Sequence, residues 1–132
     1  MENDKIKNYV KERYGKIAQN NQSCCSTSCC QSSNKDISQK IGYSKKDLDD
    51  IPKEAVLGLG CGNPVALAGL KQGEVVLDLG SGAGIDVFLA VKRVGTSGKV
   101  IGVDMTKDMI KRATTLAKER GYKNVEFRLG EI

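Results

Sequence analysis

The chain of 132 residues has room for one domain, and its 39% apolar and 28% charged residues are typical of a soluble globular protein. The net charge of +5 comes from Lys and Arg spread along the chain, and four Tyr, two Phe and no Trp are few for stacking on bases, so we expect no nucleic-acid partner. The first 20 residues are charged and no apolar run approaches the ~18 residues of a membrane span, which predicts a cytoplasmic protein with no membrane partner.

The chain begins with the pattern of an amphipathic helix over residues 4–18, with one apolar stripe made by Ile6, Val10, Tyr14 and Ile17. Residues 19–35, QNNQSCCSTSCCQSSNK, are almost free of aliphatic side chains and predict a mobile loop. This loop carries two adjacent cysteine pairs, Cys24-Cys25 and Cys29-Cys30.

Short helical segments are expected next. Ser44 and Asp47 have the S-x-x-D spacing of a capping box, which opens a helix that ends by Pro52. Residues 52–59 suit another helical turn, and Pro64 suits the first position of a small helix over residues 65–70. The intervening GLGCGNP is expected to be a loop because it has three glycines in five residues, and it carries the fifth cysteine, Cys61.

From residue 75 onward the sequence predicts a βαβαβ unit. Strands are expected from Val75 to about residue 79, over 99–104 and over 124–129, with helices over 85–94 and about 107–120 that end at Gly95 and Gly121. We expect Thr106 to cap the second of these helices, and the last strand to turn Val125, Phe127 and Leu129 inward.

This pattern predicts an α/β fold, the first half of a Rossmann-like, doubly wound parallel sheet with strand order 3-2-1. A helical, cysteine-bearing segment over residues 1–50 precedes it, and residues 51–132 form the Rossmann-like domain. The first strand would be an open edge without Lys or Pro, so we expect the chain alone to self-associate through it or to be marginally folded.

The turn after the first strand reads D-L-G-S-G-A-G, from Asp78 to Gly84. Glycines at alternate positions let the backbone turn sharply and leave no Cβ in the way of a ligand. A dinucleotide fingerprint would need glycine where Ile85 stands, and the turn instead resembles the first motif of S-adenosylmethionine (SAM) methyltransferases. The carboxylate of Asp78 suits the ammonium group of such a cofactor.

Further candidate contacts follow the next two strands, because ligands of this fold gather outside the carboxyl ends of the strands. Asp104 is placed to accept both hydrogen bonds of a ribose diol, although a strand-end acid or helix cap would look the same. Met105 suits either an adenine contact or ordinary core filling. Glu131 suits an adenine amino group or, alternatively, a solvated surface.

The segments GLGCGNPVALA, VLDLGSGAGIDVFLA and KVIGVDMTKDMI together resemble the arsenite methyltransferases, and the resemblance runs from about Ile41 to Ile132. It also takes in Tyr14-Gly15 and the cysteine-bearing loop. The resemblance implies SAM as cofactor and a thiol reductant, thioredoxin or glutathione. The expected cofactor contacts are Asp78, Gly80, Ser81, Gly82, Gly84, Asp104, Met105, Glu131 and Ile132.

The resemblance also implies that Cys61 and one or more of Cys24, Cys25, Cys29 and Cys30 act as thiols on arsenite. Five cysteines, an odd number, fit free thiols better than a disulfide framework. For the loop pairs a zinc site and idle thiols remain alternatives to metalloid capture, and for Cys61 the alternative is a small buried residue.

The family has two further essential cysteines, more strands and a C-terminal domain beyond the point where this chain ends, so the chain looks like the N-terminal part of an enzyme. Trivalent arsenic pairs with thiolates and keeps a lone pair that can attack a methyl group, so no general base is required. Two alternatives stay open: a SAM-dependent methyltransferase acting on another small molecule, and a thiol-based metalloid-binding module.

Overall fold

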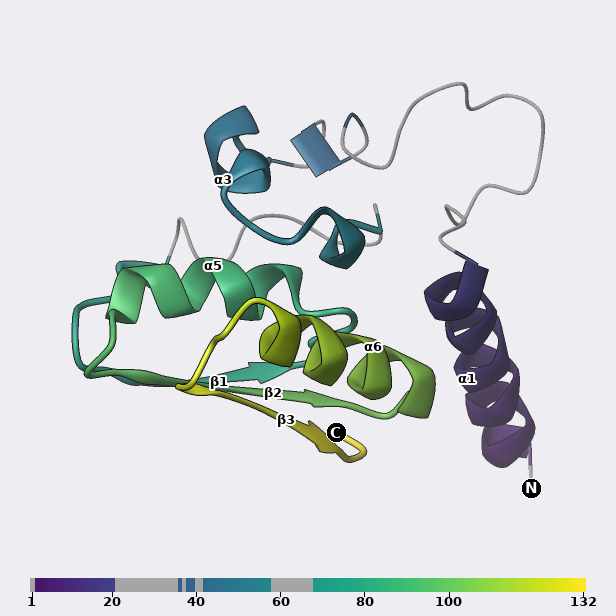
Figure 1. The fold of residues 1–132 in the computed structure, drawn as a ribbon. Coiled ribbons are helices and arrows are strands. Elements are labelled where there is room, and N and C mark those ends of the chain that lie inside the picture. Colours follow the sequence, from purple (N-terminus) through teal and green to yellow (C-terminus); the bar gives the residue numbers. More distant parts are fainter. Residues whose placement is uncertain (1, 21–35, 37, 40–41, 58–67) are drawn as a thin grey trace.

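The computed structural model describes residues 2–20, 36, 38–39, 42–57 and 68–132, and its centre is a three-stranded parallel sheet with two helices on one face (Figure 1). The strands are β1 (Val75–Leu79), β2 (Lys99–Asp104) and β3 (Val125–Leu129). The helices are α1 (Glu2–Asn20), α3 (Lys45–Asp49), the 3₁₀ turn η1 (Lys53–Ala55), α5 (Ile85–Val94) and α6 (Lys107–Glu119).

The sheet has the order β1-β2-β3 with both pairs parallel, which confirms the predicted order and the Rossmann-like arrangement. The register aligns Val76 with Val100 and Val100 with Val125, so three β-branched side chains share the face beneath the helices. Val100 is fully buried there, and α5 contacts β1 and β2 while α6 contacts β2 and β3. Alternation places the other side chains of the strands on the face opposite the helices.

Aromatic packing fixes how α5 sits on the sheet. Phe88, on α5, is fully buried, and its ring centroid lies 5.1 Å from that of Tyr122 and 5.9 Å from that of Phe127. Gly84, with φ of +97°, precedes α5, and a Cβ built on it would lie 2.9 Å from both Phe88 and Phe127. The last glycine of the turn is therefore required by close packing of α5 against β3.

Helix boundaries agree closely with the sequence pattern, and one capping detail does not. α5 ends at Val94 with Gly95 at positive φ, and the Ser44–Asp47 capping box of α3 is present, as predicted. Thr106 occupies the N-cap position of α6, but its side chain makes no capping hydrogen bond. Its backbone N–H instead donates to Oδ1 of Asp104 at 2.8 Å, so the acid of β2 provides the local contact that we expected from the threonine.

The predicted α1 stripe is only partly buried. Ile17 and Ala18 are buried with Leu57, Ala83 and Met109, but Ile6 is 59% exposed. The reason is that only the last turns of α1 pack on α6, whereas the first turns lie outside the core. Leu129 was also expected to face the core and is 58% exposed, since it lies at the end of β3.

A half-buried guanidinium joins α1 to the rest of the fold. Arg112, on α6, donates from Nε to the carbonyl oxygen of Glu54 at 2.8 Å and from Nη1 to the carbonyl oxygen of Ala18. These bonds satisfy carbonyls at the end of α1 and in η1 that have no partner within a helix. The end of α1 is therefore fixed, whereas its beginning depends on contacts made at the site.

Several predicted features lie outside the described residues: the loop with Cys24, Cys25, Cys29 and Cys30, the glycine-rich loop with Cys61, and the first half of the helix expected over 65–70. In the part of the chain that the structure describes, no helix is long and apolar enough to cross a membrane.

Replacing Gly84 with alanine should lower the free energy of unfolding by about 2–4 kcal/mol, because the new Cβ meets two aromatic rings at a positive φ. Gly82 provides the matched control, since a Cβ built there meets nothing within 4 Å and only its φ of +54° opposes substitution. Gly82→Ala should cost about 1 kcal/mol. Urea denaturation measures both, and equal losses in the two variants would contradict the packing role of Gly84.

We also expect the isolated chain to self-associate through β1. Among the described residues β1 pairs only with β2, and the face away from the helices exposes Val75, Leu77 and Leu79. Light scattering should therefore detect a mass that rises with concentration. Leu77→Lys should reduce this rise, and Ile6→Lys, which changes an equally exposed residue of α1, should not. A monomer with a cooperative melt at all concentrations would contradict the expectation.

Candidate functional site

A cavity of about 480 Å³ lies at the carboxyl ends of the strands, which point toward α1 in Figure 1. The turn after β1, the end of β2, the end of the chain and one side of α1 line it. Seven of the nine residues predicted to contact a cofactor are in this lining: Gly80, Ser81, Gly82, Asp104, Met105, Glu131 and Ile132. The structure therefore brings together in one hollow residues that are up to 52 positions apart, from Gly80 to Ile132 (132 − 80 = 52).

The glycine turn is held against the end of β2 by backbone hydrogen bonds. The N–H groups of Gly80 and Ser81 both donate to the carbonyl oxygen of Val103, at 2.7 and 2.9 Å. Gly80 and Gly82 have positive φ values of 77° and 54°, which permit this tight path. The backbone of the turn consequently forms part of the cavity wall, with open space where a side chain on Gly82 would be.

Asp104 joins the two βα turns of the sheet. Its Oδ2 accepts from the N–H of Gly82 at 3.0 Å, and its Oδ1 accepts from the N–H of Thr106 at 2.8 Å. Each carboxylate oxygen has capacity for a further hydrogen bond. The residue therefore has a structural task in this fold, and it retains acceptor sites in the cavity lining.

Asp78 lies beneath the turn and is not part of the cavity lining. Its Oδ2 is buried and has no hydrogen-bond partner among the described residues. Burial raises the pKa of Asp78 to about 7, and the negative charges of Asp86 and Asp104 add to the rise. Since the folded-state pKa exceeds the ordinary value of 3.8, this group lowers the stability of the fold progressively as the pH rises from about 3.8 to about 7, and the loss stays constant above that.

Gly84 is the second predicted contact that does not line the cavity. Its place is in the packing of α5 on β3, where the rings of Phe88 and Phe127 leave no room for a side chain. Of the three glycines of the turn, Gly80 and Gly82 therefore line the cavity, and Gly84 allows close packing of the core.

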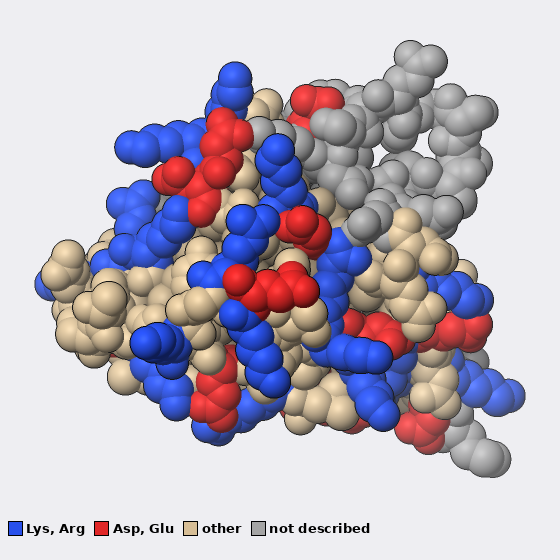
Figure 2. Space-filling view, viewed as in Figure 1, with Lys and Arg blue, Asp and Glu red and all other residues tan. Residues whose placement is uncertain are grey.

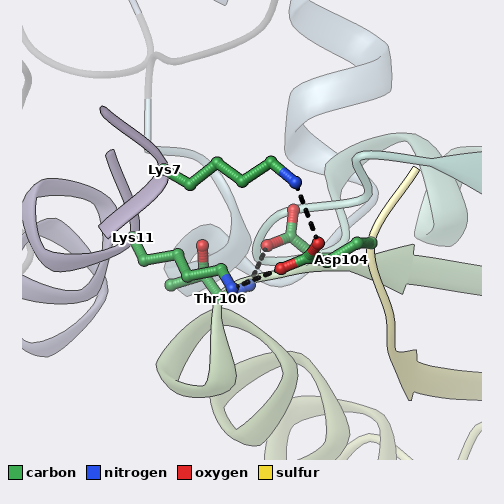
Figure 3. A network of polar contacts seen from close by, with 5 residues as sticks. Lys7, Lys11, Asp104 and Thr106 are labelled. Atoms are coloured by element: carbon green, nitrogen blue, oxygen red, sulfur yellow. Dashed lines mark hydrogen bonds and ion pairs between the residues drawn. The ribbon is translucent and has the colours of Figure 1, made fainter. Parts of the chain in front are cut away.

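Glu131 is held by α1. Lys7 approaches its Oε2 at 3.2 Å and Lys11 its Oε1 at 2.6 Å, and Figure 3 shows both lysines reaching from α1 toward the end of β2 near Asp104. Hydrogen bonds from Lys11 and Lys7 lower the pKa of Glu131. The pairs are partly exposed, so each contributes little by itself, but together they hold the beginning of α1 at the cavity.

Several lining residues were not predicted from the sequence. Lys7, Val10 and Tyr14 come from α1, and Asp86 comes from the first turn of α5. The i, i+4 spacing of Lys7 and Lys11 places them on one face of a helix, but no local pattern links residue 7 with residue 131. Asp86 was detectable as an acid two residues after the glycine turn, within the helix that the turn opens.

The surface charge is mixed. Figure 2 shows Lys and Arg interspersed with Asp and Glu over the visible face. Ion pairs such as Lys99–Glu126 and Lys92–Asp50 join surface residues of opposite charge. On this face no continuous basic surface of the kind that follows a nucleic-acid backbone is formed by the described residues.

Comparison with known proteins agrees with this geometry. A family model described as a methyltransferase domain matches residues 70–132. The arsenite methyltransferase of Halobacterium salinarum is 45% identical to the chain over 98% of the chain and 36% of that protein. The arsenite methyltransferase of Aquipseudomonas alcaligenes is 36% identical over 93% of the chain and 35% of that protein. The chain therefore spans about a third of the length of these curated relatives.

A solved structure extends the likeness to the fold. The crystal structure of an arsenic(III) S-adenosylmethionine methyltransferase from Chlamydomonas reinhardtii superposes with a TM-score of 0.58 at 38% sequence identity, over 66% of the chain and 31% of that protein. The resemblance indicated by the sequence motifs is thus confirmed. By sequence and by fold, the chain is similar to arsenite methyltransferases, and residues 70–132 match a methyltransferase-domain model.

Proposed function

We propose that this chain is the cofactor-binding part of an enzyme that transfers a methyl group from SAM to arsenic(III) bound by thiolates. The observation that carries the cofactor half is the cavity of about 480 Å³ formed by the glycine turn, Asp104 and the residues after β3. Its volume is within the range of small-molecule sites. The names of the relatives support arsenic(III) as the methyl acceptor.

The residues present fit a cofactor of this kind. The open space at Gly82 allows close approach to the backbone. Two buried polar atoms near the turn, Oγ of Ser81 and Oδ2 of Asp78, have no hydrogen-bond partner among the described residues. Buried polar atoms in folded proteins are rarely left unpaired, which marks this turn as a candidate functional element.

Each part of the lining has a proposed task. Asp104 accepts from the ribose hydroxyls with the acceptor capacity that its two backbone bonds leave over, and Met105 lies against the adenine. Glu131 and Ile132 contact the adenine from the other side. Asp78 balances the ammonium group from beneath the turn, with Gly80 and Ser81 between them. When bound, SAM supplies an electrophilic methyl group.

The thiols hold the acceptor. Cys61 stands four residues after Leu57 in the sequence, and Leu57 lines the cavity. The thiol of Cys61 is proposed as an arsenic ligand. Cys24, Cys25, Cys29 and Cys30 are proposed to capture arsenite or to cycle through a disulfide that thioredoxin or glutathione reduces. The protein would accordingly act in the cytoplasm, where thiols stay reduced. Arsenic(III) keeps a lone pair, so positioning replaces general-base catalysis.

Two other functions remain distinguishable from this one. A methyltransferase for another small molecule would bind SAM in the same cavity but would not need Cys61. A thiol-based module that binds arsenite without methyl transfer would not need the cavity at all, and the unpaired polar atoms beside it favour the enzyme.

Replacing Cys61 with serine should lower the rate of arsenite methylation by the intact enzyme roughly 100-fold or more, because serine does not bind arsenic and loss of the thiol misplaces the acceptor. The affinity for SAM should be unchanged. Cys24→Ser provides the control, since three neighbouring loop cysteines remain. The measurement is methylated arsenic formed in the presence of SAM and a dithiol, and a wild-type rate for Cys61→Ser would exclude the thiol from the reaction.

Binding of SAM should release protons near pH 6.5. In the free protein the pKa of Asp78 is raised to about 7, and a nearby cation favours the ionised carboxylate, so binding lowers the pKa. The affinity should therefore increase as the pH rises toward 7 and level off above it. Calorimetry in two buffers of different ionisation enthalpy counts the protons, and Asp78→Asn should abolish this part of the release. Identical proton counts in the wild type and Asp78→Asn would remove Asp78 from the site.

A further inference from the structure

Asp86 is a third carboxylate of the cavity, besides Asp104 and Glu131, and the motifs gave it no role. It lies in the first turn of α5 and lines the cavity with Ile85 and Ala55. An acid in the first turn of a helix is commonly explained by the helix dipole, which favours negative charge there. That explanation requires neither burial nor a side-chain partner. Asp86 is half-buried and has a side-chain partner.

The carboxylate of Asp86 is held in place by Tyr43. The tyrosine hydroxyl donates to Oδ1 of Asp86 at 2.8 Å. Tyr43 is only 2% exposed and packs in the core cluster with Leu48, Ile51 and Phe88. A rigid core side chain from the N-terminal segment thus orients a cavity carboxylate on α5. Burial raises the pKa of Asp86, and the hydrogen bond from Tyr43 opposes that rise, so the tyrosine favours the charged form.

The charges of the cavity are unevenly distributed. Among the described lining residues the carboxylates are Asp86, Asp104 and Glu131, and Lys7 is the one cation. Lys7 and Lys11 both pair with Glu131, so the negative charge at that end is compensated. Asp86 has no cationic partner among the described residues, and its charge is close enough to Asp78 to raise the pKa of that residue. The Asp86 end of the cavity is therefore suited to a positive charge.

We propose that Asp86, oriented by Tyr43, is a specificity-determining residue that makes the cavity prefer the sulfonium cofactor SAM over the neutral thioether that remains after methyl transfer, S-adenosylhomocysteine. This inference rests on the proposed function. A carboxylate in a partly desolvated cavity attracts a cation more strongly than it would in water. When the methyl group leaves, the sulfur keeps the bonding electron pair and loses its charge, so the attraction to Asp86 disappears. The product then dissociates more readily.

The test compares the dissociation constants of the two forms by calorimetric titration. Asp86→Asn keeps the shape of the side chain and an acceptor for Tyr43, and removes the charge. It should weaken SAM binding about 5- to 20-fold and change S-adenosylhomocysteine binding less than twofold, so the preference for SAM falls. A SAM analogue with an ammonium group in place of the sulfonium should follow SAM, because the preference is for charge.

Two further variants separate selectivity from stability. Tyr43→Phe retains the packing but removes the donor, and should reduce the preference for SAM in the same direction by a smaller factor. Asp108→Asn is the matched control, since Asp108 is also an acid in the first turn of a helix but lies outside the cavity lining. Its ratio of the two dissociation constants should equal that of the wild type.

The outcomes distinguish this inference from the function on which it rests. If the wild type binds neither form, the proposed function and this inference both fail. If the wild type binds both forms and Asp86→Asn weakens them equally, or weakens neither, the proposed function stands and Asp86 does not select for charge.

Discussion

The carboxylate of Asp104 is the interaction on which the site depends. One oxygen accepts from Gly82 in the turn after β1, and the other accepts from Thr106 at the start of α6, so a single side chain ties together the two βα turns of the sheet. Hydrogen bonds to an ionised acceptor are among the stronger ones in proteins. With the bonds from Gly80 and Ser81 to Val103, they fix the turn as one wall of the cavity. The same carboxylate is then available to a ligand.

Function and stability make different demands on this turn. Gly84 serves the core, because the rings of Phe88 and Phe127 occupy the space beside it. Gly82 borders open space, and a buried carboxyl of Asp78 lies unpaired beneath the turn at a cost in stability when it ionises. Residues that lower the stability of the fold and make no compensating contact within it are typical of binding sites. The unpaired groups and the open space lie on the same side of the sheet, at the carboxyl ends of its strands.

Local pattern predicted the elements well and the long-range contacts poorly. Strand and helix bounds from Val75 onward followed from β-branched runs, helical periodicity and glycine stops, and fold rules placed Asp104 and Glu131 at one edge of the sheet. The orientation of α1 was not predictable, because its contacts are with Glu131 and Arg112, more than 90 positions away. For the same reason the stripe through Ile6 was misjudged and the bond from Tyr43 to Asp86 was missed.

Titration of the protein with SAM, comparing the wild type with Asp104→Ala, tests the central role of this carboxylate most directly. Loss of the charged acceptor should weaken binding by about 1.5–3 kcal/mol, or roughly 10- to 100-fold, with a thermal melt to verify that the variant is folded. A folded Asp104→Ala variant with the dissociation constant of the wild type would contradict the placement of SAM at the carboxyl ends of the strands.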